Sequence, residues 1–145
     1  PVFSFIFAPN RNLLWYALKR KGVFLNGKKI KKIKNFNDIL IDNYPTPKGI
    51  AKKIFTRLSM KNYIECGSLG LKSALIANND ANLFVKNIKY YDWDIMPALL
   101  MIREQKYFMR DLNGNSIKLS GDLKKNNGLI VTNNYRYLKD VMKNI

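Results

Sequence analysis

Short apolar runs separated by polar turns fill the first part of the chain, a pattern typical of antiparallel strands. Four segments carry the pattern: the apolar runs 2–8, 13–18 and 22–25, and the lysine-rich segment 28–33. The first two flank the polar turn Asn10-Arg11-Asn12 and predict one hairpin. The last two flank Asn26-Gly27, the strongest short hairpin signal, because both central positions of such a turn adopt positive φ. We therefore expect a meandering antiparallel sheet at the start of the fold.

An amphipathic helix is predicted next. Ile50, Ile54 and Leu58 recur at a spacing of four, which places them on one face of a helix. We expect the helix to begin at Thr46-Pro47, since threonine can cap free N–H groups and proline is tolerated at the first helical position. The opposite, basic face carries Lys48, Lys52 and Lys53. One stripe of this helix should therefore face the core.

Strand and helix patterns then alternate to the end of the chain. Strands are expected at residues 38–42, 63–64, 83–85, 107–110, 116–119 and 129–132. Helices are expected at residues 71–78, 94–104 and 135–142. The strands at 107–110 and 116–119 should form a hairpin around Asn113-Gly114. Together these elements predict an α/β fold with a mixed, partly antiparallel sheet flanked by helices.

The composition narrows the class of protein. With 145 residues and 47% hydrophobic content, the chain can bury one sizeable core, so a single domain is expected. Its apolar runs are far shorter than the ~20 residues that a bilayer span needs, so no membrane anchor is expected. The single cysteine, Cys66, cannot form an internal disulfide, and a reducing cytoplasm is the simplest compartment. The absence of histidine excludes Cys-His and Ser-His dyads within this chain.

The net charge of +16 indicates a preference for anions. One hypothesis is a basic, non-enzymatic module that binds RNA or another polyanion through residues 28–34 and 48–53. The abundance of Lys, Asn and Ile is also what an AT-rich genome would produce, and a solvated strand or loop would show the same alternation of Lys and Ile. Polyanion binding is therefore kept as the alternative to a small anionic substrate.

Two motifs carry candidate chemistry. Asp92-Trp93-Asp94 opens the apolar helical run at residues 95–102, and the glycine turn Cys66-Gly67-Ser68 precedes it in the chain. A carboxylate at a helix start offers the hard oxygen ligand that magnesium prefers. A glycine turn before a helix lets a phosphate approach the free N–H groups. Each motif also has a structural explanation, in which the aspartate or the serine only caps its helix.

Four motifs follow one another along the chain in a recognisable order. They are Gly67-Ser68-Leu69-Gly70-Leu71-Lys72, Ala81-Asn82-Leu83-Phe84, Trp93-Asp94-Ile95 and Arg110-Asp111-Leu112-Asn113-Gly114. This order resembles the C-terminal half of the inositol monophosphatase superfamily. The resemblance implies the layered αβαβα fold of sugar phosphatases and Mg²⁺-dependent hydrolysis of phosphate monoesters. It also implies that Asp94 is a metal ligand and that Gly67, Ser68 and Leu69 bind the substrate.

The resemblance also bears on the substrate, through Lys86 and Asn87. In the inositol-specific members a glutamate resembling position 87 binds the ring hydroxyls, and that glutamate is missing here. In the 3'(2'),5'-bisphosphate nucleotidases a basic residue resembling position 86 can meet a second phosphate. The substrate is therefore expected to be a nucleotide bisphosphate or an inositol phosphate, and Lys86 slightly favours the nucleotide.

Some features depart from the family pattern. The helix after Asp94 contains Pro97, which we expect in its first turn, and it ends in Glu104-Gln105 where the family has Glu-Ala-Gly-Gly. The family's Asp-Pro-Ile/Leu-Asp-Gly-Thr motif, which supplies the other metal carboxylates, has no match. We expect residues 1–145 to be a C-terminal half-domain without catalytic residues of its own and inactive alone. Its expected partners are the missing N-terminal half and a second copy of the chain.

Overall fold

A computed structural model of the chain describes residues 1–33, 36–121 and 127–145. The first sheet is a four-stranded antiparallel meander in the order β1-β2-β3-β4. Its strands are β1 (Phe3–Ala8), β2 (Leu13–Leu18), β3 (Gly22–Leu25) and β4 (Lys28–Lys29). The short 3-10 helix η1 (Pro9–Arg11) joins the first two strands. Both predicted hairpins are confirmed, and Asn26 and Gly27 have the expected positive φ.

The second sheet has five strands in the order β6-β5-β7-β9-β8. They are β5 (Ile39–Asp42), β6 (Asn62–Glu65), β7 (Leu83–Lys86), β8 (Phe108–Arg110) and β9 (Leu129–Thr132). Strand β5 is parallel to β6 and β7, and β9 is antiparallel to both β7 and β8. Strand β8 therefore runs in the same direction as β5, β6 and β7. The carboxyl ends of these four strands lie at one edge of the sheet.

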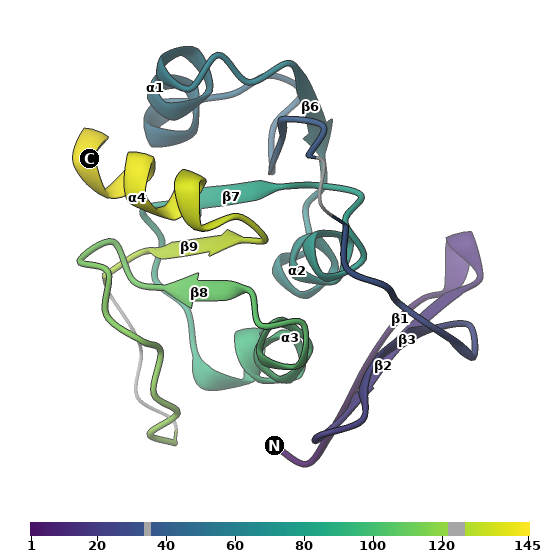
Figure 1. Cartoon of the computed structure of the whole chain (residues 1–145). Helices are drawn as coiled ribbons and strands as arrows, with labels where there is room; N and C mark the ends of the chain where they lie inside the picture. Colours follow the sequence, from purple (N-terminus) through teal and green to yellow (C-terminus); the bar gives the residue numbers. More distant parts are fainter. Residues whose placement is uncertain (34–35, 122–126) are drawn as a thin grey trace.

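Four α-helices and the two sheets stack in layers (Figure 1). The helices are α1 (Gly49–Arg57), α2 (Leu69–Ala77), α3 (Asp92–Glu104) and α4 (Tyr135–Asn144). Helices α1 and α4 cover one face of the five-stranded sheet, where Leu83 and Ile130 pack with Ile54. Helices α2 and α3 cover the other face and separate it from the four-stranded sheet. This mixed α/β architecture confirms the predicted fold class.

The environment of each helix follows from its place among these layers. Helix α2 lies between two sheets, and all residues from Lys72 to Ala77 are buried. Such all-round burial suits its nearly continuous apolar sequence. Helix α1 covers only one face, so Ile54 is buried while Lys52 and Lys53 are exposed, as its amphipathic pattern predicts.

The second strand of the expected hairpin at residues 107–110 and 116–119 does not form. Residues 117–119 belong to no strand, and Ser116 makes only an isolated bridge to Arg110. The Asp111 carboxylate accepts hydrogen bonds from the N–H groups of Asn113 (3.0 Å) and Asn115 (2.7 Å). This side-chain-closed turn replaces a tight two-residue turn. Strand β8 pairs with β9 instead.

Two helix starts also differ from expectation. Helix α1 begins at Gly49, with Lys48 rather than Thr46 at the N-cap. The backbone of Lys48 is extended (φ −129°, ψ 158°), so the helix does not continue back through Pro47 to Thr46. Helix α3 begins at Asp92, so Pro97 lies in its second turn rather than its first. Its missing N–H removes one hydrogen bond from the helix.

One face of the four-stranded sheet is exposed. Phe3, Phe5 and Phe7 are 51%, 59% and 52% exposed, and Leu14 and Leu18 beside them are also exposed. The alternate residues of β1 face helices α2 and α3. No helix within the described residues is long and apolar enough to cross a membrane.

Candidate functional site

The carboxyl edge of the five-stranded sheet gathers the predicted site residues. Asp42 ends β5, Glu65 ends β6 and Lys86 ends β7. Because α2 follows β6 and α3 follows β7, both helices begin at this edge. Ligand sites of α/β proteins form at the carboxyl ends of parallel strands. The topology therefore places the Gly67 turn, Lys86 and Asp94 at one edge of one sheet.

The Gly67 turn links β6 to α2 and leaves its outer side open. A Cβ atom added at Gly67 would meet no described atom within 4 Å. Ser68 is the N-cap of α2, and its Oγ accepts a hydrogen bond from the N–H of Leu71 (3.2 Å). Leu69 is the first helical residue. The turn therefore presents the positive end of α2 to an accessible space, which is the usual anion-binding geometry.

Asp94 is the third residue of α3. Its Oδ2 accepts a hydrogen bond from the N–H of Tyr91 (2.7 Å), which closes the first turn of the helix. The carboxylate is half-buried. The neighbouring rings of Tyr91 and Trp93 stack at 4.3 Å. Capping engages one carboxylate oxygen through a single N–H and leaves the group able to bind a cation as well.

Asp92, in contrast, is buried and hydrogen-bonded within the fold. It is the first residue of α3, and only 2% of its surface is exposed. Its Oδ2 accepts a hydrogen bond from the N–H of Ser120 (2.6 Å). This bond ties the segment after β8 to the start of the helix. The two aspartates of the Asp-Trp-Asp motif therefore have different surroundings, and Asp94 has the more accessible one.

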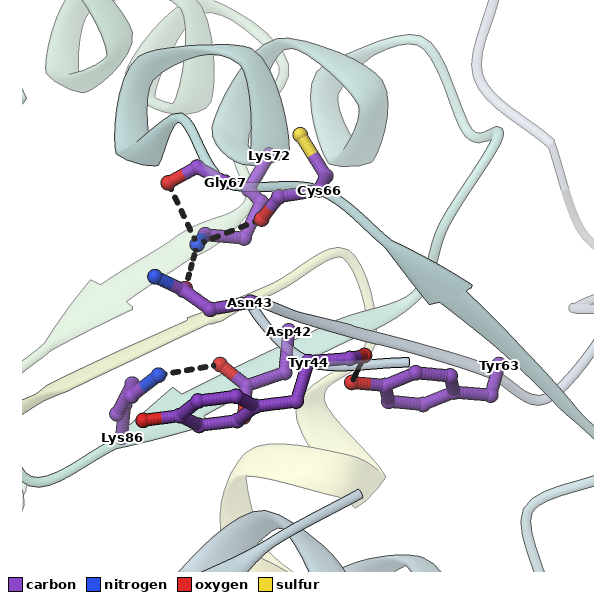
Figure 2. A network of polar contacts seen from close by, with 8 residues as sticks. All are labelled: Asp42, Asn43, Tyr44, Tyr63, Cys66, Gly67, Lys72 and Lys86. Atoms are coloured by element: carbon purple, nitrogen blue, oxygen red, sulfur yellow. Dashed lines mark hydrogen bonds and ion pairs between the residues drawn. The ribbon is translucent and has the colours of Figure 1, made fainter. Parts of the chain in front are cut away.

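Lys86 forms an ion pair that sequence reasoning missed. Its Nζ lies 2.9 Å from the Asp42 Oδ1, and the two side chains are 16% and 1% exposed (Figure 2). The same Nζ lies 4.4 Å from the centre of the Tyr44 ring. The one available signal was a charged residue, Asp42, directly after the apolar run of β5. The ammonium expected to meet a second phosphate is therefore held by a carboxylate in this structure.

At the same edge of the sheet, the Tyr63 hydroxyl donates a hydrogen bond to the Tyr44 carbonyl (2.6 Å). Burial raises the pKa of Tyr63, and the nearby negative charge of Asp42 raises it further, while the hydrogen bond to Tyr44 opposes the shift. Tyr63 therefore remains a neutral hydrogen-bond donor at physiological pH. It holds the segment after β5 against β6.

A cleft of about 970 Å³ opens beside Lys86, between the sheet edge and helices α1 and α4. Lys48, Lys53 and Lys86 line it together with Asn87 and Tyr44, and none of its described lining residues is acidic. The Lys48 ammonium also lies against the Tyr44 ring, 4.7 Å from its centre. Such a cleft attracts anions. Its apolar lining residues are Ile50, Leu112, Met142 and Ile145.

A complete metal centre is not present among the residues that the structure describes. No group of three or more Asp, Glu, Cys or His side chains there could hold a metal ion. Magnesium usually takes one or two protein carboxylates and completes its octahedron with waters and substrate phosphate oxygens. Asp94 fits one such ligand. The described residues could therefore supply one ligand of a magnesium site, but they do not provide a complete site.

The layered fold and the position of this edge define the class of protein as a sugar-phosphatase-like α/β protein. Residues 1–145 match the sequence model of the inositol monophosphatase family, and the chain belongs to that family. The fructose-1,6-bisphosphatase/inositol-1-monophosphatase of Methanocaldococcus jannaschii is 30% identical over 129 residues. That match covers 87% of this chain and 50% of the relative.

Solved structures agree on the fold. A Pyrococcus horikoshii protein with similarities to inositol-1 monophosphatase superposes with a TM-score of 0.84 at 24% identity. The match covers 100% of this chain and 57% of that one. Inositol monophosphatase II of Staphylococcus aureus superposes with a TM-score of 0.78 at 19% identity, over 99% of this chain and 55% of that one. The chain thus spans about half the length of these proteins.

Proposed function

We propose that this chain supplies the substrate-binding turn and one metal ligand of a magnesium-dependent phosphate monoester hydrolase. Membership of the inositol monophosphatase family supports the reaction class. The observation that carries the proposal is the common position of the Gly67 turn and Asp94. Both lie where helices begin at the carboxyl edge of the same sheet.

In this proposal the turn binds the phosphate group. The N–H groups of Gly67, Ser68 and Leu69 surround the start of α2, where four backbone donors lack intrahelical partners. Ser68 satisfies only one nearby donor, that of Leu71. The helix dipole adds a partial positive charge at the same place. A phosphate oxygen can therefore replace water at this turn without any rearrangement of the helix.

Asp94 would hold one Mg²⁺ ion. A bound magnesium ion polarises the phosphate group and lowers the pKa of a coordinated water. The hydrogen bond from the Tyr91 N–H fixes the orientation of the Asp94 carboxylate. Further carboxylates come from the half of the family protein that this chain does not span. We therefore assign no catalytic residue to this chain and expect little hydrolysis by the chain alone.

The basic cleft favours a substrate with a second phosphate. Three lysines line it, and among the described residues only Lys86 of these three is paired with a carboxylate. Asn87 borders the cleft with a neutral amide, which does not repel a second phosphate as a glutamate would. A 3'(2'),5'-bisphosphate nucleotide therefore fits better than an inositol monophosphate. Structures of this fold have been solved with inositol monophosphate and with 2'-AMP bound.

The test compares the chain alone with an assembled enzyme. The chain is joined to the portion of the M. jannaschii relative that lies outside the matched region, and phosphate release is followed against Mg²⁺ concentration. We expect magnesium-dependent release from the assembly, faster with a 3',5'-bisphosphate nucleotide than with inositol monophosphate. Robust hydrolysis by the 145-residue chain alone would contradict the assignment of the other ligands elsewhere.

A second candidate function is polyanion binding, and the exposed lysines of α1 favour it. Lys52 and Lys53 project from the solvent face of this helix beside the basic cleft. The other expected contact segment, residues 28–34, ends outside the described residues. Binding of RNA through phosphate contacts weakens steeply with added salt. Tight, salt-sensitive RNA binding combined with an inactive assembly would favour this second function.

A further inference from the structure

Helix α2 contains a fully buried lysine that the proposed function does not use. Lys72 is 1% exposed, although it lies in a helix packed between two sheets. Its ammonium lies 4.8 Å from the centre of the Phe84 ring. A buried charge is costly unless hydrogen bonds or an opposite charge compensate it. A methionine or leucine at this place would fill the same space without that cost, so the ammonium group calls for a specific explanation.

The partners of Lys72 lie in the Gly67 turn and in the segment after β5 (Figure 2). Its Nζ donates hydrogen bonds to the carbonyl oxygens of Cys66 (3.0 Å) and Gly67 (3.5 Å). It also donates to the side-chain oxygen of Asn43. An ammonium has three donors, and three neutral acceptors receive them. Lys72 therefore links the backbone of the turn to Asn43 in the segment that follows β5.

The charges around this lysine do not balance. The titratable groups that act electrostatically on it are Asp42 on β5, Cys66 in the turn and Lys86 on β7. Lys86 already forms the ion pair with the single carboxylate, Asp42. Burial lowers the pKa of Lys72 to about 8, while the charge of Asp42 opposes this shift. One carboxylate thus stands against two ammonium groups, that of buried Lys72 and that of half-buried Lys86, and an anion at the turn would restore the balance.

We propose that Lys72 is a positioning residue that holds the Gly67 turn in its anion-binding conformation, and that anion binding at the turn favours the charged form of Lys72. The second part rests on the proposed function, since the anion is taken to be a phosphate. Binding linkage is reciprocal, so an anion that stabilises the ammonium is itself bound more tightly when the lysine is protonated. Anion affinity should therefore fall as the pH rises through 8.

The first experiment tests positioning in the full chain without any ligand. Amide hydrogen exchange is measured for residues 66–71 in the unsubstituted chain, in Lys72→Met and in the matched exposed control Lys52→Met. We expect exchange at the turn to become roughly tenfold faster in Lys72→Met while the rest of the helix is unchanged. Lys72→Arg, which keeps the charge and the donors, should recover part of the protection.

A folded Lys72→Met protein with unchanged exchange at the turn would overturn the positioning role. If Lys72→Met does not fold, Asn43→Ala provides the same comparison, because it removes one acceptor and keeps the ammonium. Faster exchange at residues 66–71 in Asn43→Ala supports the proposal, and unchanged exchange contradicts it.

The second experiment tests the linkage with sulfate, whose charge stays constant over this pH range. Shifts of the Gly67, Ser68 and Leu69 amide resonances are followed at pH 7 and pH 9. We expect severalfold weaker sulfate binding at pH 9 in the unsubstituted chain and no such change in Lys72→Met. Equal pH dependence in both proteins contradicts the linkage. Amides that do not respond to sulfate at either pH contradict the proposed function and the linkage, while the exchange result decides the positioning role separately.

Discussion

The two sheets of this protein differ in how completely they are covered. The five-stranded sheet has helices on both faces, and its central strands β7 and β9 are buried except at Lys86. The four-stranded sheet has helices α2 and α3 on one face only. Its other face exposes Phe3, Phe5 and Phe7 to solvent. The proposed chemistry lies at the edge of the covered sheet, whereas the half-covered sheet leaves an apolar face exposed.

The exposed face has the character of an interface. On it Phe5 lies opposite Tyr16, and Tyr16 stacks on Phe24 with ring centres 5.0 Å apart. Soluble monomers rarely expose a continuous apolar patch of several large side chains. Strand β1 is also an edge strand, with one side free to pair. The five-stranded sheet is therefore stabilised by packing on both faces, whereas the four-stranded sheet is stabilised by packing on one face only.

The largest expected effect concerns the covered sheet and its edge. Asp94→Asn in the assembled enzyme should reduce magnesium-dependent turnover by roughly a hundredfold or more, because the amide is a much poorer magnesium ligand. Stability should change by no more than ~1 kcal/mol, since asparagine caps about as well as aspartate. Turnover against Mg²⁺ concentration and chemical unfolding measure the two quantities.

The control for this variant must be chosen from the structure. Asp92 is unsuitable, because its carboxylate is buried and accepts the Ser120 N–H. Asp140→Asn is a better control, since this half-buried carboxylate forms an ion pair with Arg136 on the same helix, α4. Retained turnover in Asp94→Asn, or equal losses in both variants, would remove Asp94 from the site.

The second prediction compares one residue type on the two sheets. Phe84 is fully buried at the centre of β7, and Phe5 is 59% exposed on β1. Phe84→Ala should destabilise the chain by about 3–5 kcal/mol, as expected for a large core truncation. Phe5→Ala should cost less than ~1 kcal/mol. Urea unfolding measures both. A similar cost for the two variants would show that the face around Phe5 is covered in solution.

The third prediction concerns self-association through the exposed face of the four-stranded sheet. The chain by itself should associate with increasing concentration, because water contact with the aromatic patch is unfavourable. Phe5→Lys should shift the sedimentation profile toward the monomer, whereas Lys52→Met on the opposite side of the molecule should not. A monomeric, cooperatively unfolding chain at high concentration would contradict the assignment of this face as an interface.

The smallest expected effect is a pH dependence of stability that belongs to the covered sheet. Burial lowers the pKa of Lys72 from 10.5 to about 8, so the unfolded chain binds more protons than the folded chain between these pH values. The free energy of unfolding should therefore rise as the pH increases from 8 toward 10. Lys72→Met should lack this rise. Urea unfolding at pH 8.0 and 9.5 compares the two proteins.

The trend should reverse at higher pH. Burial raises the pKa of Tyr90 from 10.0 to about 12, with added effects of Asp111 and Asp92. Above pH 10 the unfolded chain loses this proton first, so stability falls as the pH rises toward 12. Persistence of the alkaline fall in Lys72→Met would separate the tyrosine effect from the lysine effect.

Short-range patterns in the sequence were sufficient to predict several parts of the fold. The Asn26-Gly27 hairpin and the inward face of α1 formed as expected. Each depends on interactions among residues only a few positions apart. The order of the Gly67 and Asp94 motifs was likewise sufficient to identify the family, and the match over the whole chain confirmed it. The functional roles of these two motifs remain predictions.

Local sequence patterns therefore predicted most of the elements and the family of this protein, but not the strand at 116–119 or the exact starts of α1 and α3. Only the tertiary structure decided the partner of β8, the ion pair of Asp42 with Lys86 and the burial of Lys72. These features join residues that are far apart in the chain, and many pairings would satisfy the same local pattern. Packing selects among them, because burial makes an unpaired strand edge or charge costly only after the layers have assembled. The sequence could not predict the difference between the two sheets for the same reason. An apolar strand has the same sequence pattern whether another element covers its face or the face is exposed to solvent.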